Sequence, residues 1–232
     1  MNKIAFPPVE EPLMHSLAPL FFLGLTASSA LVKPAAAQTA SNRAKFQNVL
    51  VLGDSISAGY GLKRAEAYPA LLVAKAAAAG EPIHLSNAGL SGETSAGGLR
   101  RLPHLLRQPV DVLLIQLGIN DAFRGVPVPQ IEANLQKIID LTRAHSPGVR
   151  IVLAGMQLPN HSESDYLREF GEMYVELARR NRAELIPFLL EGVLGNPNLN
   201  QPDLIHPNAS GQKIIAANVW PVLERVLRGN GL

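Results

Sequence analysis

Continuous aliphatic runs alternate with helix-like segments along most of this chain. The clearest run is "VDVLLIQL", which ends in Leu117 and is dominated by aliphatic side chains. Strands without polar alternation are typical of parallel sheets that helices cover on both faces. Such runs predict strands at 48–52, 110–117 and 149–155, and a less aliphatic stretch at 83–88 and a short one at 183–186 complete a prediction of five strands.

The segments between these runs have helical periodicity. They predict helices at 68–79 and 94–106, from 129, from 162 with Ser162 in the capping position, and at 208–227. Pro103 and Pro221 are expected to kink or shorten their helices. Strand–helix alternation of this kind predicts an α/β protein: a three-layer doubly wound flavodoxin-like fold with a five-stranded parallel sheet.

Residues 1–37 have the pattern of a secretory signal peptide. An apolar stretch of 15 residues at 17–31 is too short to span a bilayer, and small residues follow it at 35–37. An N-terminal membrane anchor is the alternative. We expect cleavage near Ala37, a flexible lead-in at 38–46 and one domain at 47–232. That domain is then periplasmic or secreted and has no stable membrane anchor.

The composition excludes several other classes of protein. A formal net charge of +2 without a basic run argues against a nucleic-acid partner, and the absence of cysteine excludes a disulfide framework. The glycine-rich segment "GLSGETSAGG" lacks the lysine that a phosphate-binding loop requires. We expect a monomer that uses neither a metal ion nor an organic cofactor.

Polar residues of particular types follow the predicted strands. "GDS" with Ser55 follows the first strand, "LSGET" with Gly92 the second, and "GIND" with Asn120 the third. "DLIHPN", with Asp203 and His206, comes after the fifth. Because the carboxyl ends of parallel strands meet at one edge of the sheet, we expect these loops to lie together.

These are the residue types that acyl transfer requires. A serine hydroxyl needs a base to become a nucleophile, and a carboxylate must orient a histidine that acts as that base. We predict Ser55 as nucleophile, His206 as base and Asp203 as the orienting carboxylate. The backbone N–H groups of Ser55 and Gly92 and the Asn120 amide are the predicted oxyanion hole.

Each motif taken alone has a structural explanation. "GDS" is ordinarily a turn, and Asn120 with Asp121 is ordinarily a helix cap. His161 also lies at a predicted strand end and is a rival base, although no carboxylate stands beside it in a comparable motif. We expect Asp54 and Asp121 to organise their loops by hydrogen bonding. The catalytic interpretation depends on all the motifs occurring together.

The four blocks "GDSISAGYG", "SGETSAGGLRRLP", "GINDAFRG" and "DLIHPN" resemble those of the SGNH (GDSL) hydrolases in order and spacing. Within that family the chain is most similar to the periplasmic thioesterase I type, whose members also act as lysophospholipases and arylesterases. The resemblance implies a serine ester hydrolase with the site residues predicted above. This chain departs from the family pattern at three places. Members of the family often have glycine where this chain has Ile119, and often read Pro-x-Asn-Tyr-Gly where it has "PNHSE" from Pro159. They more commonly have glycine where it has Leu204.

Apolar residues beside the motifs suggest what the substrate is. "AFRGVPVP" puts Phe123 and Val126 next to Asn120, and "MQLPNH" adds Leu158 and Pro159. Exposed apolar side chains near a catalytic centre favour a groove for the acyl tail of a small ester or thioester. The alternatives are that these residues pack under the following helix, that the protein is a carbohydrate acetylesterase, or that it is a non-catalytic acyl- or glycan-binding module.

Overall fold

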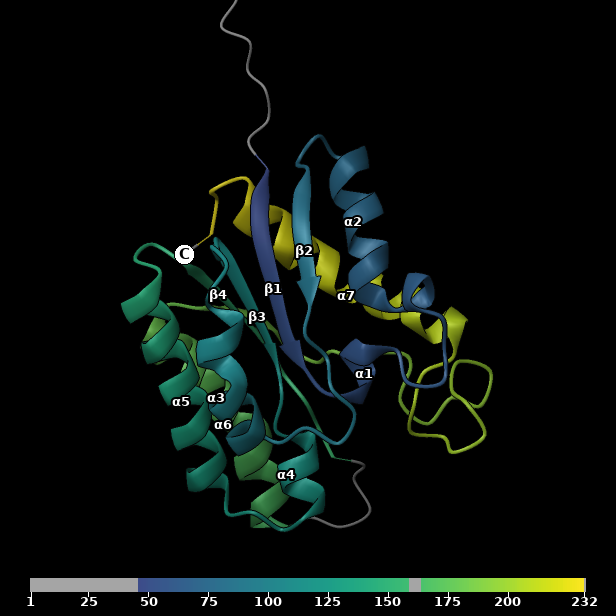
Figure 1. Ribbon diagram of the computed structural model, residues 1–232. Helices are drawn as coiled ribbons and strands as arrows, with labels where there is room; N and C mark the ends of the chain where they lie inside the picture. Colours follow the sequence, from purple (N-terminus) through teal and green to yellow (C-terminus); the bar gives the residue numbers. More distant parts are fainter. Residues whose placement is uncertain (1–45, 159–163, 232) are drawn as a thin grey trace, which may run out of the picture. The chain divides into compact units, whose positions relative to one another are not determined.

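Five parallel strands form one sheet in the order β2-β1-β3-β4-β5 in a computed structural model of the protein (Figure 1). The strands are β1 (Gln47–Gly53), β2 (Ile83–Asn87), β3 (Val112–Gln116), β4 (Arg150–Ala154) and β5 (Glu184–Ile186). The structure describes residues 46–158 and 164–231, which belong to one compact unit. The predicted signal peptide, most of the predicted lead-in, Pro159 and His161 lie outside these residues.

Helices cover both faces of the sheet, which confirms the predicted three-layer fold. On one face α2 (Tyr68–Ala78) packs against α7 (Ala209–Leu227). On the other, α3 (Ser95–Leu105), α5 (Val128–His145) and α6 (Asp165–Asn181) pack side by side. Pro103 and Pro221 lie inside α3 and α7, and neither proline ends its helix.

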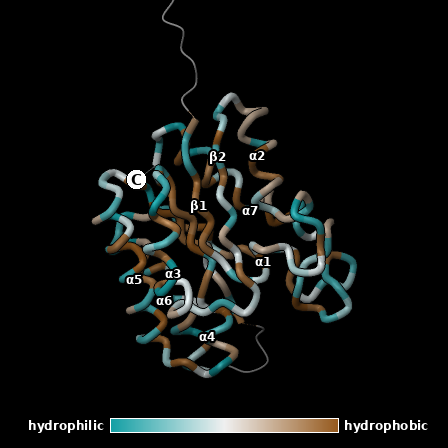
Figure 2. Tube along the Cα trace, viewed as in Figure 1, coloured by the Kyte–Doolittle hydropathy of each residue, from teal (hydrophilic) through white to brown (hydrophobic). Residues whose placement is uncertain are grey.

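The core lies on the central strands. Val51, Leu52, Leu113 and Leu114 have no exposed surface, so these strands meet helices on both faces. Figure 2 shows the same distribution, with hydrophobic strands in the middle and more hydrophilic stretches on the outer helices. Continuous burial explains why the strands could be read as unbroken aliphatic runs.

Strand order reverses between β1 and β3, since the chain passes from β1 outward to β2 and then returns to the other side of β1. Leu52 of β1 pairs with Ile115 of β3, so the two strands end close together. In doubly wound sheets, ligands bind outside the carboxyl ends of the strands at such a switch point. We therefore expect a ligand site at the segments that follow β1 and β3.

Three short elements were not anticipated from the sequence: α1 (Ser55–Ala58), the 3₁₀ helix η1 (Arg64–Glu66) and α4 (Ile119–Phe123). None of them is long enough to develop helical periodicity. The predicted capping position at Ser162 was wrong. The α6 helix begins at Asp165, and the Ser164 hydroxyl accepts a hydrogen bond from Leu167 N at 3.3 Å.

Candidate active site

A tight strand-to-helix turn positions Ser55 at the end of β1. The fully buried Asp54 caps α1, because its Oδ1 accepts a hydrogen bond from Ile56 N at 2.9 Å. A Cβ atom on Gly53 would lie 2.2 Å from Ser57 Oγ, so only glycine fits there. Ser55 is then the first residue of α1, and helix geometry gives its N–H no intrahelical acceptor. The structure thus explains why each residue of "GDS" stands at its position.

His206 joins Ser55 to Asp203. Its Nε2 lies 3.0 Å from Ser55 Oγ, and its Nδ1 lies 2.7 Å from Asp203 Oδ2. Ser55 and His206 are 151 positions apart in the chain. When Nδ1 carries the proton that it shares with the carboxylate, Nε2 is free to accept the serine proton. The structure therefore brings the three predicted catalytic residues together in one hydrogen-bonded chain.

The Asp203 carboxylate also organises its own turn. Its Oδ1 accepts hydrogen bonds from Ile205 N at 3.0 Å and His206 N at 2.9 Å. These bonds to the backbone and to the His206 ring lower the pKa of Asp203 to about 2, so it stays ionised at neutral pH. The three-residue spacing of "DLIH" lets one carboxylate hold both the backbone and the ring of His206.

Tyr60 is a contact that the sequence analysis missed. Its ring packs against the His206 imidazole in a tilted arrangement, with 4.5 Å between centroids and 38° between planes. Its carbonyl accepts a hydrogen bond from Gln201 Nε2 at 2.7 Å, which ties the segment after α1 to the loop before α7.

The predicted oxyanion donors come from three separate segments: α1, the turn at Gly92, and α4. Gly92 has φ +75°, a left-handed conformation that favours glycine. Asn120 Nδ2 donates to Glu93 O at 3.0 Å, which fixes the amide next to the Gly92 turn, and lies 3.4 Å from Asp54 Oδ2. In the part of the chain that the structure describes, neither Ser55 N nor Gly92 N has a hydrogen-bond acceptor. Both N–H groups are therefore available to an acceptor from outside.

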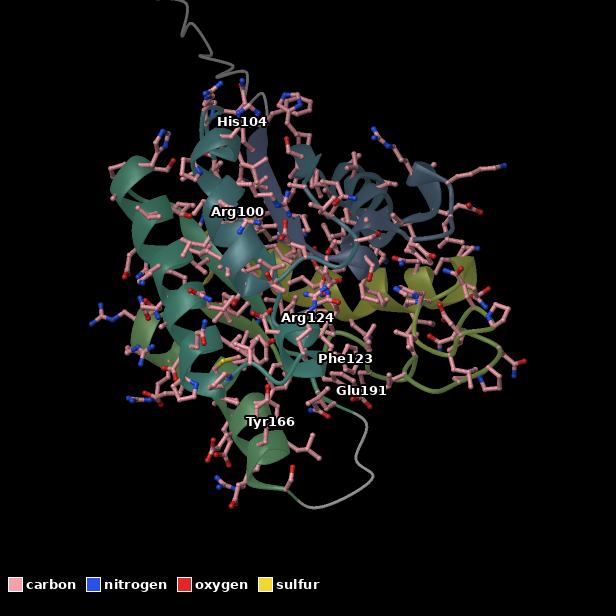
Figure 3. All side chains as sticks on the ribbon, turned by 60° about the horizontal axis from the view of Figure 1, so that its bottom comes forward. Arg100, His104, Phe123, Arg124, Tyr166 and Glu191 are labelled. Carbon is pink, nitrogen blue, oxygen red and sulfur yellow. The ribbon has the colours of Figure 1, made fainter. Side chains whose placement is uncertain are left out.

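Two arginines that the sequence analysis did not single out support these loops. Arg101 pairs with Glu93 at 2.5 Å and donates to Gly53 O at 3.2 Å, joining the turn after β2 to the end of β1. Arg124 donates from Nη1 and Nη2 to Gly92 O, each at 3.2 Å. Figure 3 shows Arg124 next to Phe123 at the end of α4.

Asp121 organises its loop as the sequence predicted. Its Oδ2 accepts a hydrogen bond from Ser95 N at 2.8 Å, and its Oδ1 accepts one from Ser95 Oγ at 2.6 Å. These bonds join α4 to the start of α3.

An apolar cavity of about 280 Å³ opens beside the serine. It is lined by Ser55, Ile56, Ile119, Asn120, Phe123, Met156, Gln157, Leu190, Leu194, Leu204, Ile205 and His206. Phe123, with 57% of its surface exposed, thus lies near Asn120, as the sequence predicts. Val126 and Leu158 are not among the lining residues. Val126 packs against the core, where its carbonyl accepts a hydrogen bond from Tyr166 OH, and Leu158 borders a second groove along α6.

Burial of Asp54 has a consequence for stability. Desolvation raises the pKa of its carboxyl to about 6, against the hydrogen bond from Ile56 N that lowers it. A folded-state pKa above the unfolded value means that this contribution to stability is present below about pH 4 and is lost as the pH rises through 6.

We therefore expect Asp54→Asn, which keeps an acceptor for capping, to be more stable than the parent at pH 8. The difference should be on the order of 3 kcal/mol and should shrink toward pH 4. Urea unfolding of both proteins at several pH values measures it. A difference that stays constant from pH 4 to pH 8 would contradict the stated cause.

Comparison with known proteins identifies the family. The model of the GDSL-like lipase/acylhydrolase family matches residues 51–214. Esterase TesA of Pseudomonas aeruginosa is 40% identical over 188 residues, which is 81% of this chain and 92% of TesA. An arylesterase of Vibrio mimicus is 37% identical over 182 residues, or 78% and 90% of the two chains.

Two further similarities agree with these. Thioesterase 1/protease 1/lysophospholipase L1 of Escherichia coli is 37% identical over 174 residues, or 75% of this chain and 81% of that protein. A crystal structure of TesA superposes with a TM-score of 0.74 at 40% identity and covers 78% of this chain and 99% of that one. The matched residues run from β1 into α7 and include every motif described above. The chain is a carboxylic ester hydrolase that belongs to the GDSL-like lipase/acylhydrolase family.

Proposed function

We propose that the protein hydrolyses small acyl esters and thioesters through a Ser55–His206–Asp203 triad and a covalent acyl-enzyme. The observation that carries this proposal is the hydrogen-bonded chain from Ser55 Oγ through His206 to Asp203 at the rim of an apolar cavity. Among the described residues, no group of three or more histidine, aspartate or glutamate side chains is placed to hold a metal ion.

In the first half of the reaction, His206 Nε2 takes the proton of Ser55 Oγ as the oxygen attacks the substrate carbonyl. The oxygen–carbon bond forms and the carbonyl electrons move onto the oxyanion. Collapse of this intermediate breaks the bond to the alcohol or thiol, which leaves with the proton from His206. Asp203 stabilises the imidazolium that exists between these two steps.

In the second half, His206 takes a proton from water, and the resulting hydroxide attacks the acyl carbonyl. The acid leaves as the proton returns to Ser55 Oγ. In both halves the oxyanion is assigned to the N–H groups of Ser55 and Gly92 and to Asn120 Nδ2. Support comes from the two unpaired backbone N–H groups and from the Glu93 carbonyl that fixes the Asn120 amide.

The cavity favours an apolar acyl group as the part of the substrate that it binds. Most of its lining side chains are aliphatic or aromatic, and its volume suits a chain of several carbons rather than a large polar ring. The names of the relatives include arylesterase, thioesterase and lysophospholipase. We include lysophospholipids among the proposed substrates because they carry one acyl ester on a hydrophobic tail.

The value of kcat/KM for p-nitrophenyl esters should rise from acetate toward octanoate, since each buried methylene contributes at most about 0.8 kcal/mol. Phe123→Ala should flatten this rise, because its ring lines the cavity and is half-exposed without substrate. A series of four chain lengths measured on both proteins tests this.

Leu141→Ala is the matched control, since Leu141 is a similarly exposed apolar residue on α5. It should leave the chain-length profile as it is in the parent. If acetate were the best ester and Phe123→Ala left the profile unchanged, the acyl groove would be refuted, and carbohydrate acetylesterase would become the better function.

We also propose that the protein acts in the periplasm or outside the cell, as a monomer, after removal of residues 1–37. The support is the apolar stretch at 17–31 followed by small residues, together with a domain that starts at 47, where β1 begins. Across residues 46–158 and 164–231, no helix is both long and apolar enough to cross a bilayer.

A further inference from the structure

Leu204 has an unusual backbone conformation for its residue type. Among the described residues, two that are not glycine have a positive φ: Arg182 at 47° and Leu204 at 58°. Arg182 closes the end of α6, where a left-handed residue is ordinary. Leu204 lies in the turn between Asp203 and His206, and an L-residue with a branched side chain is unfavourable there.

The turn from Asp203 to His206, here called the catalytic turn, holds Leu204 in this conformation. Asp203 Oδ1 accepts hydrogen bonds from the N–H groups of both Ile205 and His206, and Leu204 N donates to Gln201 O at 2.9 Å. These bonds enclose Leu204 and hold it in the observed conformation. Glycine or asparagine would adopt that conformation with little strain.

Packing in the folded protein does not explain the leucine. Half of the Leu204 surface is exposed. Within the described part of the chain, it belongs neither to the hydrophobic core nor to the apolar residues that pack against it. A strained residue that contributes little to the core indicates a role outside folding.

The Leu204 side chain instead lines the cavity beside Ser55. It shares this lining with its neighbour Ile205, with Phe123 of α4, and with Leu190 and Leu194 of the segment after β5. Leu204 and Phe123 are each about half-exposed, so both keep apolar surface that a bound acyl chain would cover.

We propose that Leu204 is a specificity-determining residue, kept in a strained backbone because its side chain forms the part of the acyl-binding wall that the catalytic turn itself provides. The inference rests on the proposed function, since it assigns a wall residue to the acyl cavity of that same site. Leu204 lies in the chain between Asp203 and His206, and His206 contacts Ser55. The position of this part of the wall is therefore fixed relative to Ser55.

Two variants separate the strain from the specificity. Leu204→Asn removes the apolar side chain and tolerates the left-handed backbone, whereas Leu204→Ala removes the side chain and keeps the strain. In both, the ratio of kcat/KM for p-nitrophenyl octanoate to that for the acetate should fall about 10-fold. The Tm should rise by ~2–4 °C in the Asn variant and should not rise in the Ala variant.

Arg182→Asn is the matched control, because it relieves a left-handed residue away from the cavity. It should raise the Tm and leave the octanoate-to-acetate ratio unchanged. A parental ratio in both Leu204 variants would overturn the inference, whatever their Tm. Failure of the proposed function would look different, because acetate hydrolysis would then survive Ser55→Ala.

Discussion

Ser55→Ala and His206→Ala should each lower kcat for an acyl ester by about 10⁶-fold. Ser55 supplies the atom that becomes acylated, and His206 Nε2, 3.0 Å from Ser55 Oγ, moves its proton. Loss of either residue stops both halves of the reaction, so the two effects should not add. Rates of p-nitrophenyl butyrate hydrolysis by the purified variants measure the effect, and thermal unfolding shows whether each variant is folded.

A fluorophosphonate probe gives a second readout, since only an activated serine is labelled. The parent should be labelled at Ser55, and both variants should remain unlabelled. Ser86→Ala, at an exposed serine of β2, should keep both the rate and the labelling. A folded Ser55→Ala protein that hydrolyses the ester within 10-fold of the parent rate would show that the triad is wrong.

Asn120→Ala should lower kcat by about 10²–10³-fold, equivalent to 2.7–4 kcal/mol, with little change in KM. Its amide is one of three proposed donors to the oxyanion, which exists only during the reaction and not in the bound ester. The loss should therefore appear in kcat. Steady-state kinetics on the purified variant measures both constants.

A purely structural role for Asn120 gives another result. Asn120 Nδ2 also donates to Glu93 O, so that role predicts a lower Tm with a normal kcat for the folded fraction. Asn134→Ala is the matched control, because its amide donates to Ser95 Oγ and holds the same region of the fold. It should lower the Tm and leave kcat near the parent value, and an equal loss of kcat in both variants would refute the oxyanion assignment.

The central strands of the sheet were predictable because they are buried on both faces. Residues 49–52 of β1 and 112–115 of β3 are buried and entirely aliphatic, so these strands are visible as continuous runs. Strand order followed from the alternation of strands and helices, which leaves few topologies open. The α1 and α4 helices were missed because helices of 4 and 5 residues carry no periodicity.

Residue types at the strand ends were enough to propose the site, because acyl transfer uses few groups and a parallel sheet gathers its strand ends at one edge. Contacts made across the fold were not visible in the same way. Nothing in the sequence assigned the Tyr60 ring to His206. Nor could the sequence separate Phe123, which lines the cavity, from Val126, which packs inward three residues later.

Local pattern and a small set of possible chain topologies were sufficient to predict the strands of the sheet, their order and the residue types proposed for catalysis. The three-dimensional packing was needed to show that Ser55 and His206 lie 3.0 Å apart, that burial raises the pKa of Asp54 to about 6, and that Leu204 takes a left-handed backbone. Distances, desolvation and strain depend on how segments far apart in the chain pack together, and no local pattern records that packing.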